Sequence, residues 1–409
     1  MRWMLRALLA LAAGCAAAVP PSTTAWPALT VGQAEQSAAP AMWAGVDGLT
    51  LAWVGADDSG IHQDARAITP GGMTAAVVLP LPPARPYGQQ LAPAAGSDRH
   101  LLWMDADAEG QNRLYAAVIT ADLAVKRGPT PVSAEATRRY AILSNGDGSL
   151  WVVSGGGLPA EPRLRAYYID PSGRPRQDSL APLAADADWP SFVRWGGGAV
   201  DLFWWQPSDG AVKYAPFDAE NGTLGSPTSV TTLNLAPGDR LEALSAAHDR
   251  TRGYLFANLT RAGGERETWF AGGMAGAAAW GDMRRLGIEV QAGRAFEAGF
   301  NAGDVLAAGP GELWLSLAAP AQGDFERLPA AALAGDDLGI VYFEGGQPAG
   351  FQVIAPDAGL IGPPALQADG ERFLYLAWAQ PARSGSAALR AASLRLAAWP
   401  PVERLLHEN

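Results

Sequence analysis

Cysteine, lysine and histidine are all scarce in this chain. Its 409 residues include one cysteine, Cys15, and two lysines, Lys126 and Lys213. A single cysteine cannot form an internal disulfide or supply a cysteine-based zinc site. The four histidines are widely spaced and no H-E-x-x-H motif occurs, so the sequence does not support a zinc centre and we expect no metal.

Positive charge is also scarce. The formal net charge is -11, and no run of Lys or Arg occurs after the first six residues. Nucleic-acid binding requires a basic patch that faces the phosphates, so we exclude nucleic acid as a partner. The chain also lacks G-x-S-x-G, the phosphate loop G-x-x-x-x-G-K-[ST], and a G-x-G-x-x-G that follows a strand. We therefore expect no cofactor.

Long hydrophobic runs are missing as well. The longest, Ala7 to Val19, is too short to cross a bilayer as a helix, and two arginines precede it. A basic start with a short apolar core predicts an export signal over residues 1–18. Within it, LAAGC (Leu11–Cys15) resembles the lipobox of bacterial lipoproteins, and this resemblance implies acylation of Cys15.

Two alternatives stay open for this segment. Ala16 and Ala18 form an A-x-A site that would allow ordinary cleavage after Ala18, and the segment would otherwise remain as an uncleaved anchor. Cleavage by either route gives an exported protein, either a cell-envelope lipoprotein or a secreted one. Residues 19–35 are expected to form a tether and a possible closing strand.

Short strands and turns dominate what the sequence does contain. Its 48 glycines and 32 prolines, with 17% charged residues, suit many short strands better than long helices. One pattern recurs: a hydrophobic strand, a turn rich in Gly, Asp, Ser or Pro, and a second strand. The predicted hairpins cover residues 48–68, 100–119, 149–169, 201–217, 254–272, 312–332 and 373–394.

The hairpins repeat with a period of about 50 residues, as Trp53, Trp103 and Trp204 illustrate, and the spacing lengthens toward the C-terminus. An Ala/Gly-rich segment precedes each hairpin and suits an innermost strand, and a more polar stretch follows it. Four strands per unit predict an all-β fold, a β-propeller of seven four-stranded blades that forms one domain over residues 36–406. Six or eight blades remain possible, because GIVYFEGGQPAGFQVIA (Gly339–Ala355) belongs to one blade or to two.

Two further expectations concern packing. The segments Trp26–Gln36 and Ala397–Leu406 are expected to share one blade and so cover its edges. Tryptophans are expected to pack between adjacent blades; they include Trp53, Trp103, Trp151, Trp204, Trp205, Trp314 and Trp378.

In architecture, this strand rhythm resembles bacterial extracytoplasmic propellers of the sialidase-like and WD40-like kind. Sialidase propellers carry Asp boxes of the form S-x-D-x-G-x-T-W and an F-R-I-P motif. The nearest stretch here, SNGDGSLW (Ser144–Trp151), has its Asp one place late, and no F-R-I-P or Trp-Asp strand ending occurs. The resemblance implies a fold and leaves sialidase activity without a motif.

The stretch DADAEG has the beginning of a calcium loop. Asp105, Asp107 and Glu109 would take the first, third and fifth positions, with Gly110 sixth, but Ala116 stands where a bidentate Glu is needed. Other predicted hairpins have ADDSG and PSDG at the same place. We therefore predict a hairpin turn here.

The candidate site is the mouth of the central channel, where the innermost strands begin. The residues predicted there are Tyr87, Arg138, Arg139, Asp188, Trp189, Arg240, Glu242, Arg294 and Glu297. Several arginines around one mouth would bind a carboxylate or sulfate, and paired acids beside them would suit glycoside hydrolysis. The alternative is that these are solvated charges, paired across neighbouring blades.

Three functions fit this sequence. The first is a non-enzymatic, exported, lipid-anchored propeller that binds a protein or a glycan, and the missing catalytic motifs favour it. The second is a propeller-type glycoside hydrolase or lyase, which predicts carboxylates that converge beside Trp189 or Tyr87. The third is a purely structural envelope component. We expect a monomer that contacts the membrane only through its lipid anchor.

Overall fold

Every regular element of the described chain is a β-strand. The computed structural model describes residues 24–34, 40–45, 48–69, 72–81, 86–157, 161–176, 183–195, 198–248, 252–264, 266–274, 280–285, 288–290, 294–296, 301–309, 312–320, 336–344, 347–355, 365–368, 373–381, 387–395 and 403–404. None of these residues forms a helix long and apolar enough to cross a membrane. The export signal and Cys15 lie outside the described residues.

The strands form antiparallel sheets, each built mainly from consecutive strands. The first sheets are β2 (Ala41–Gly45), β3 (Gly48–Asp57), β4 (Gly60–Thr69) and β5 (Gly72–Met73), with β6 (Val77–Val78) also on β4; β7 (Tyr87–Pro93), β8 (Arg99–Ala106), β9 (Asn112–Ile119) and β10 (Val125–Pro131); β11 (Thr137–Ser144), β12 (Leu150–Gly156), β13 (Arg163–Ile169) and β14 (Ala184–Ala185); and β15 (Asp188–Arg194), β16 (Val200–Gln206), β17 (Ala211–Asp218) and β18 (Thr223–Leu224), with β19 (Thr228–Thr232) also on β17.

The later sheets follow the same plan. They are β20 (Arg240–His248), β21 (Arg252–Thr260), β22 (Arg266–Met274) and β23 (Arg284–Arg285); β26 (Asn301–Gly309), β27 (Glu312–Pro320), β28 (Asp336–Glu344), β29 (Gln347–Ala355) and β33 (Glu403–Arg404); and β30 (Ala365–Ala368), β31 (Phe373–Pro381), β32 (Ala387–Arg395) and β1 (Thr24–Ala34). A separate pair is β24 (Ile288–Val290) with β25 (Arg294–Phe296).

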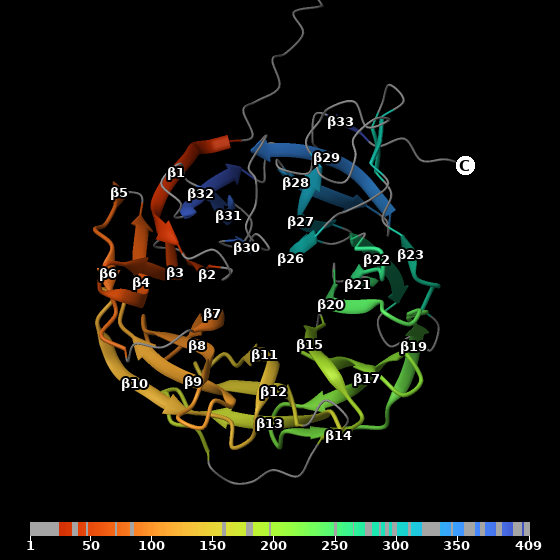
Figure 1. Cartoon of the computed structure of the whole chain (residues 1–409), viewed down its shortest axis with the longest axis horizontal. Helices are drawn as coiled ribbons and strands as arrows, with labels where there is room; N and C mark the ends of the chain where they lie inside the picture. Colours follow the sequence, from red (N-terminus) through yellow and green to blue (C-terminus); the bar gives the residue numbers. More distant parts are fainter. Residues whose placement is uncertain are drawn as a thin grey trace, which may run out of the picture.

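The sheets are arranged as a ring. The first strand of each contacts the first strand of the next, from β2 through β7, β11, β15, β20 and β26 to β30, and β30 contacts β2. Figure 1 shows these first strands at the centre, with the others further out. This closed arrangement of radiating sheets is a β-propeller, which confirms the predicted all-β class and architecture.

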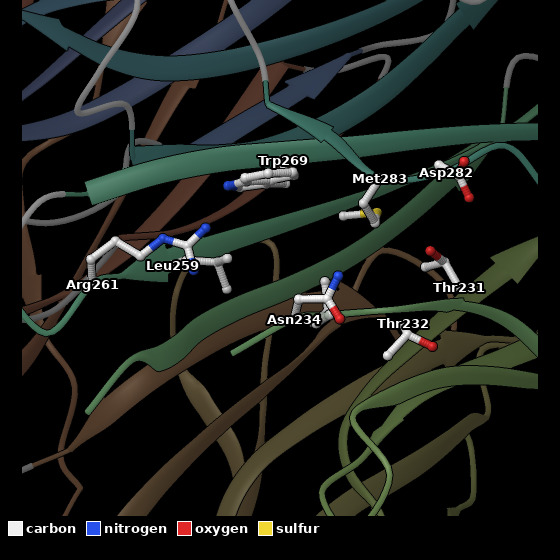
Figure 2. A pocket seen from close by; sticks show the side chains of 9 residues that line it. Thr231, Thr232, Asn234, Leu259, Arg261, Trp269, Asp282 and Met283 are labelled. Atoms are coloured by element: carbon white, nitrogen blue, oxygen red, sulfur yellow. The ribbon is translucent and has the colours of Figure 1, made fainter. Parts of the chain in front are cut away.

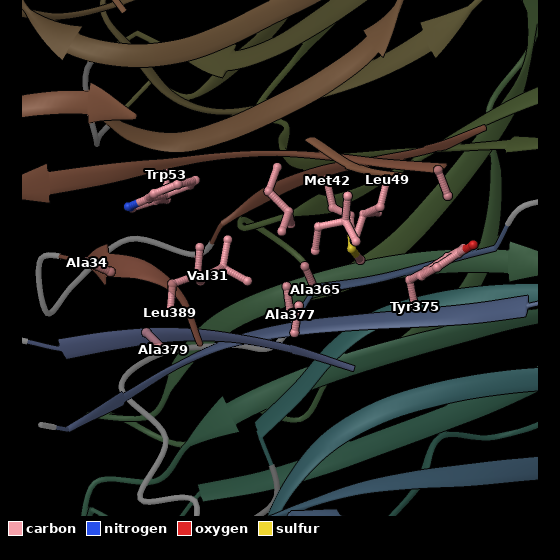
Figure 3. Close-up of a cluster of buried hydrophobic side chains, with 14 residues drawn as sticks. Val31, Ala34, Met42, Leu49, Trp53, Ala365, Tyr375, Ala377, Ala379 and Leu389 are labelled. Carbon is pink, nitrogen blue, oxygen red and sulfur yellow. The ribbon is translucent and has the colours of Figure 1, made fainter. Parts of the chain in front are cut away.

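The core lies between neighbouring sheets. Second strands such as β12 (LWVVSGG) are buried along their whole length, because a neighbouring sheet covers each face. One cluster joins Val31 of β1, Trp53 of β3 and Leu389 of β32, and Figure 3 shows Val31 between the other two side chains. Another joins Trp151 of β12 to Trp204 of β16.

The predicted packing of tryptophans is confirmed where side chains are described. Trp53, Trp103, Trp151, Trp204 and Trp378 are all buried. Trp205 is half-buried, and the side chain of Trp314 lies outside the described part of the structure. Each buried indole covers apolar surface that a single thin sheet would leave exposed.

The prediction that the two terminal segments share one blade is wrong, because their strands β1 and β33 lie in different sheets. Strand β1 pairs with β32, so the N-terminal segment completes the sheet of the last hairpin. Arg66 of β4 also donates a hydrogen bond to the Val31 carbonyl of β1. The described part of the C-terminal segment is β33, which pairs with β29 in the preceding sheet. Each terminal strand therefore covers one sheet edge: β1 covers the edge of β32, and β33 covers the edge of β29.

One predicted hairpin is wrong. In the predicted segment 312–332, β27 is paired on both sides, with β26 and with β28, and β28 begins only at Asp336. Residues 321–332 lie outside the described residues. The stretch Gly339–Ala355, which the sequence assigned to one blade or to two, covers the end of β28 and all of β29. Both strands lie in the same sheet as β26 and β27. The other six predicted hairpins are formed by β3–β4, β8–β9, β12–β13, β16–β17, β21–β22 and β31–β32.

The DADAEG stretch is the predicted hairpin turn. It joins β8 to β9, and Asp107 accepts hydrogen bonds from the backbone N–H groups of Glu109 and Gln111. Asp107 also pairs with the guanidinium of Arg113, whose hydrogen bond holds the pKa of that carboxyl below its ordinary value. Gly110 takes a positive φ of 77°, which a glycine adopts easily.

Gly222 offers a test of how tightly the sheets pack. Its φ is +68°, and a Cβ atom there would collide with the indole ring of Trp151. We expect Gly222→Ala to lower the free energy of unfolding by about 2 kcal/mol, through backbone strain together with the collision. Chemical denaturation measures this. Gly110→Ala is the matched control, because its φ is similarly positive but no atom lies within 4 Å; equal losses for both variants would contradict the predicted contact.

Candidate functional site

The first strands all begin on one face of the ring. Tyr87, at the start of β7, is opposite Met104 near the end of β8, and Asp188, at the start of β15, is opposite Trp205 near the end of β16. The turns that follow the second strands therefore lie on this same face. We call it the mouth face.

Two arginines and one aspartate form the centre of the mouth face. Arg138 Nη2 lies 3.1 Å from Asp188 Oδ2, and Arg139 Nη1 lies 3.4 Å from the same oxygen. The arginines belong to β11 and the aspartate to β15, which are first strands of adjacent sheets. Their side chains are 27%, 28% and 9% exposed, so the pairs are largely shielded from water.

The surrounding chain fixes Asp188. The backbone N–H of Trp189 donates to Asp188 Oδ1 at 2.9 Å. Gly155 of β12 lies beside it, and a Cβ atom there would stand 2.5 Å from the same oxygen. A glycine is therefore the residue that fits next to this carboxylate.

Trp189 holds Arg139 by stacking. The Cζ atom of Arg139 lies 3.4 Å from the centroid of the Trp189 ring, a close cation–π contact. Trp189 has a φ of +58°, and the pairing of β15 with β16 is irregular between Asp188 and Ser191. A bulky aromatic residue rarely adopts this backbone conformation, and such strain gathers at functional sites.

Tyr87 lies within electrostatic reach of the cluster. Burial raises the pKa of its hydroxyl above the ordinary value, and the negative charge of Asp105 raises it further, while Arg139 lowers it. Tyr87 is consequently protonated at neutral pH. Burial lowers the pKa of Arg139, the negative charges of Asp188 and Glu242 raise it, and the positive charge of Arg138 lowers it further. A guanidinium has so high an ordinary pKa that Arg139 stays a cation.

Arg240 and Glu242 lie on β20, the next first strand. Arg240 Nε is 3.2 Å from Glu242 Oε1, and the two side chains are 72% and 46% exposed. Glu242 is near enough to Arg139 to influence its pKa, so it belongs to the cluster electrostatically. Arg240 is mainly a solvated partner of Glu242.

The last two predicted residues fall elsewhere. Arg294 lies in β25, which pairs with β24 as a separate hairpin before β26. It therefore does not stand at the beginning of a first strand, as the sequence had suggested. Glu297 lies outside the described residues.

The mouth face also contains polar residues that were not predicted. Gln89 of β7 donates to Gln63 of β4 at 2.6 Å. His62 Nε2 lies 3.3 Å from Asp64 Oδ1, and burial raises the pKa of that carboxyl. His62 and Gln63 follow the β3–β4 turn by only a few residues. That position in the repeat could have placed them on the mouth face from the sequence. Where the structure describes the chain, no group of three or more His, Cys, Asp or Glu side chains could hold a metal ion.

Comparison with known proteins gives the fold. No protein-family model and no curated protein matches this sequence. The solved structure of polysaccharide lyase Uly1 matches with a TM-score of 0.56 and 9% identity, over 94% of this chain and 94% of its own. A protein of unknown function from Dyadobacter fermentans matches with a TM-score of 0.51 and 10% identity, over 90% of this chain and 99% of its own.

A further match is a polysaccharide lyase of family PL25, an ulvan lyase. Its TM-score is 0.47 at 11% identity, over 75% of this chain and 84% of its own. At 9% and 10% identity, the two matches with TM-scores above 0.5 show a shared fold alone, and a fold does not fix an activity because one fold serves many activities. What this chain does must therefore be argued from the mouth face.

The cluster suits an anionic ligand. Arg138, Arg139 and Arg240 carry three positive charges against the two negative charges of Asp188 and Glu242, which leaves one positive charge at this place. Each guanidinium has several N–H groups, and among the described residues only one from each bonds to Asp188. A carboxylate or sulfate placed here would accept from the others.

Proposed function

We propose that the mouth face binds an acidic sugar residue of a polysaccharide and cleaves the chain there by β-elimination, as a lyase. The observation that carries this proposal is the pair Arg138 and Arg139, which share the carboxylate of Asp188; the Arg240–Glu242 pair beside them is balanced, so one positive charge is left. The likeness in fold to a polysaccharide lyase supports it.

Elimination from a uronate has three chemical requirements. A cation must neutralise the sugar carboxylate so that the C5 proton becomes acidic. A base must then take that proton, which leaves its electron pair to form the C4–C5 double bond. Finally, the bond from C4 to the glycosidic oxygen breaks, and an acid supplies a proton to that oxygen.

The mouth face has a residue for each requirement. Arg138 and Arg139 would bind the sugar carboxylate. Tyr87, whose pKa burial raises, holds its proton at neutral pH and would donate it to the leaving oxygen. Glu242, a half-exposed carboxylate close to Arg139, is the acceptor we assign to the C5 proton.

Glycoside hydrolysis fits this geometry less well. It requires one carboxyl group that donates a proton and a second that acts as base or nucleophile. Asp188, the carboxylate at the centre, already accepts from two guanidinium groups and from the Trp189 N–H, so its oxygens are engaged within the protein. A lyase uses the same two arginines directly, and for this reason we favour elimination over hydrolysis.

We further propose how the protein is organised and where it acts. The sheets of four or five strands would be the seven blades of the propeller, with β24 and β25 as an insertion. Export through the signal over residues 1–18, with Cys15 as a lipid anchor, would place a monomer in the cell envelope, where polysaccharides are accessible. The partner would then be a carbohydrate and not a protein or a nucleic acid.

The wild-type protein tests this proposal directly. It would be incubated with polygalacturonate, alginate and glucuronan, and with neutral xylan as the control. We expect at least one acidic polymer to yield unsaturated oligosaccharides, seen by their ultraviolet absorbance, while xylan stays intact. Mass spectrometry separates elimination from hydrolysis, because a hydrolysis product is heavier by one water. Saturable binding without any product would instead support a non-enzymatic glycan-binding module.

A further inference from the structure

A pocket lies between two neighbouring sheets, and none of its residues belongs to the mouth cluster of Arg138, Arg139, Asp188, Trp189, Tyr87 and Glu242. Thr231 and Thr232 end β19, and Asn234 follows them, while Trp269 comes from β22 and Asp282 precedes β23. Its volume is about 360 Å³, which is within the range of small-molecule sites. Figure 2 shows these side chains around one space, with Trp269 and Met283 on one side and Asn234 and the threonines on the other.

A network of ion pairs holds one wall of this pocket. Arg261 contacts Asp239 and Glu267, at 2.7 Å in each case. Burial alone would lower the pKa of Arg261, but the hydrogen bonds that Arg261 donates to these two acids raise it above its ordinary value. Trp269 donates from its indole nitrogen to Glu267 at 2.9 Å. The indole is therefore fixed, and the charge of Arg261 is already balanced.

The remaining polar groups of the pocket are uncommitted. Within the described part of the chain, the side chains of Thr231, Thr232, Asn234 and Asp282 make no hydrogen bond or ion pair. They offer two hydroxyls, one amide and one carboxylate, next to apolar walls formed by Trp269 and Met283. Hydroxyls and amides both donate and accept, so they match a ligand that carries many hydroxyl groups.

Charge decides what kind of ligand fits. The acids Asp239 and Glu267 are balanced by Arg261 and the nearby Arg285, whose guanidinium lies 3.5 Å from Glu267. Asp282 then leaves one net negative charge, which repels an acidic ligand. This is the opposite of the mouth cluster, where one net positive charge remains.

We infer that this pocket binds a neutral sugar residue. The apolar face of the sugar ring would pack on Trp269 and Met283, and its hydroxyls would bond to the threonines, Asn234 and Asp282. The two sites share no residue, so the inference stands whether or not the mouth face cleaves polysaccharide. A protein with both sites would bind a heteropolymer that contains acidic and neutral sugars.

Calorimetric titration of the full chain tests the inference. The probes are xylotriose, cellotriose and mannotriose, with trigalacturonate as the acidic comparison. We expect at least one neutral trisaccharide to bind with a dissociation constant of about 1 mM. Asn234→Ala combined with Asp282→Ala should weaken that binding about tenfold, which corresponds to the loss of one or two hydrogen bonds. Both positions are exposed, so the fold should not suffer.

The variants also separate the two sites. Arg139→Ala should leave neutral trisaccharide binding unchanged, because Arg139 lies in the mouth cluster. The inference is overturned if no neutral trisaccharide binds, or if the double substitution leaves neutral binding intact. It is also overturned if trigalacturonate competes with the neutral sugar in the Arg139→Ala variant. A failure of lyase activity alone affects only the proposal for the mouth face.

Discussion

Replacing Arg139 by alanine should lower kcat/KM for the acidic polysaccharide by about 100-fold or more. Arg139 is the more constrained of the two arginines, since it pairs with Asp188 and stacks on Trp189. Loss of a preorganised cation that faces developing negative charge typically costs this much in transition-state stabilisation. The fold should survive, because Arg138 remains 3.1 Å from Asp188 and keeps that carboxylate paired.

Initial rates of unsaturated product over a range of polymer concentrations measure this effect. Arg139→Lys keeps the charge but loses the planar fork and the stacking, so an intermediate loss of about tenfold is expected. Arg174→Ala is the matched control. Arg174 is exposed in the turn after β13, which lies on the face of the ring opposite the mouth face. If Arg139→Ala turned over the polymer as fast as Arg174→Ala, the mouth cluster would not bind the substrate carboxylate.

Tyr87 can be distinguished from the arginines by the same assay. As the proton donor it should mainly affect kcat, whereas the arginines should affect KM as well, because they also bind the ground-state carboxylate. The Tyr87 pKa lies above its ordinary value, so activity should persist to mildly alkaline pH and fall only as the hydroxyl ionises.

The ring could be predicted from sequence because each unit repeats its own local pattern. A small-residue first strand and a hydrophobic hairpin recur closely enough that six of seven hairpins were placed correctly. The failure at residues 312–332 has a physical reason. Hydrophobic alternation reports which residues form strands, but it does not report which strands pair across an intervening segment, and β27 finds its partner only at Asp336. The pairing of β33 with β29 was not predicted for the same reason, because the assembled ring decides which sheet edge is left for a terminal strand.

The site was predictable to the extent that geometry follows from the repeat. Arg138, Arg139, Asp188 and Trp189 begin first strands of adjacent sheets, so a propeller necessarily brings them together. The positive φ of Trp189 and the burial of the ion pairs between the two arginines and Asp188 could not be predicted from the spacing of the repeats. Arg294 was misplaced because it lies in β25, whose pairing with β24 adds two strands that interrupt the period. The pocket beside Trp269 is built from outer strands, where the repeat is weakest, and no motif indicated it.

Replacing Trp204 by alanine should lower the free energy of unfolding by about 3–5 kcal/mol. The Trp204 side chain is 2% exposed and belongs to the cluster that joins β12 to β16, so its removal leaves a cavity between two sheets. The cavity weakens both sheets that line it, because each sheet buries its faces only against its neighbours. Trp204→Phe should cost less, because it keeps an aromatic ring in the same space.

Trp205 provides the comparison within the same strand. Successive side chains of a strand point to opposite faces, so Trp205 packs partly against the other neighbouring sheet and is only half-buried. Trp205→Ala should therefore cost clearly less than Trp204→Ala in chemical denaturation followed by circular dichroism. If the two variants lost equal stability, burial between sheets would not be the dominant source of stability at this position. Such a result would make strand pairing within each sheet the main source of stability here, because both residues pair with β17 in equivalent places.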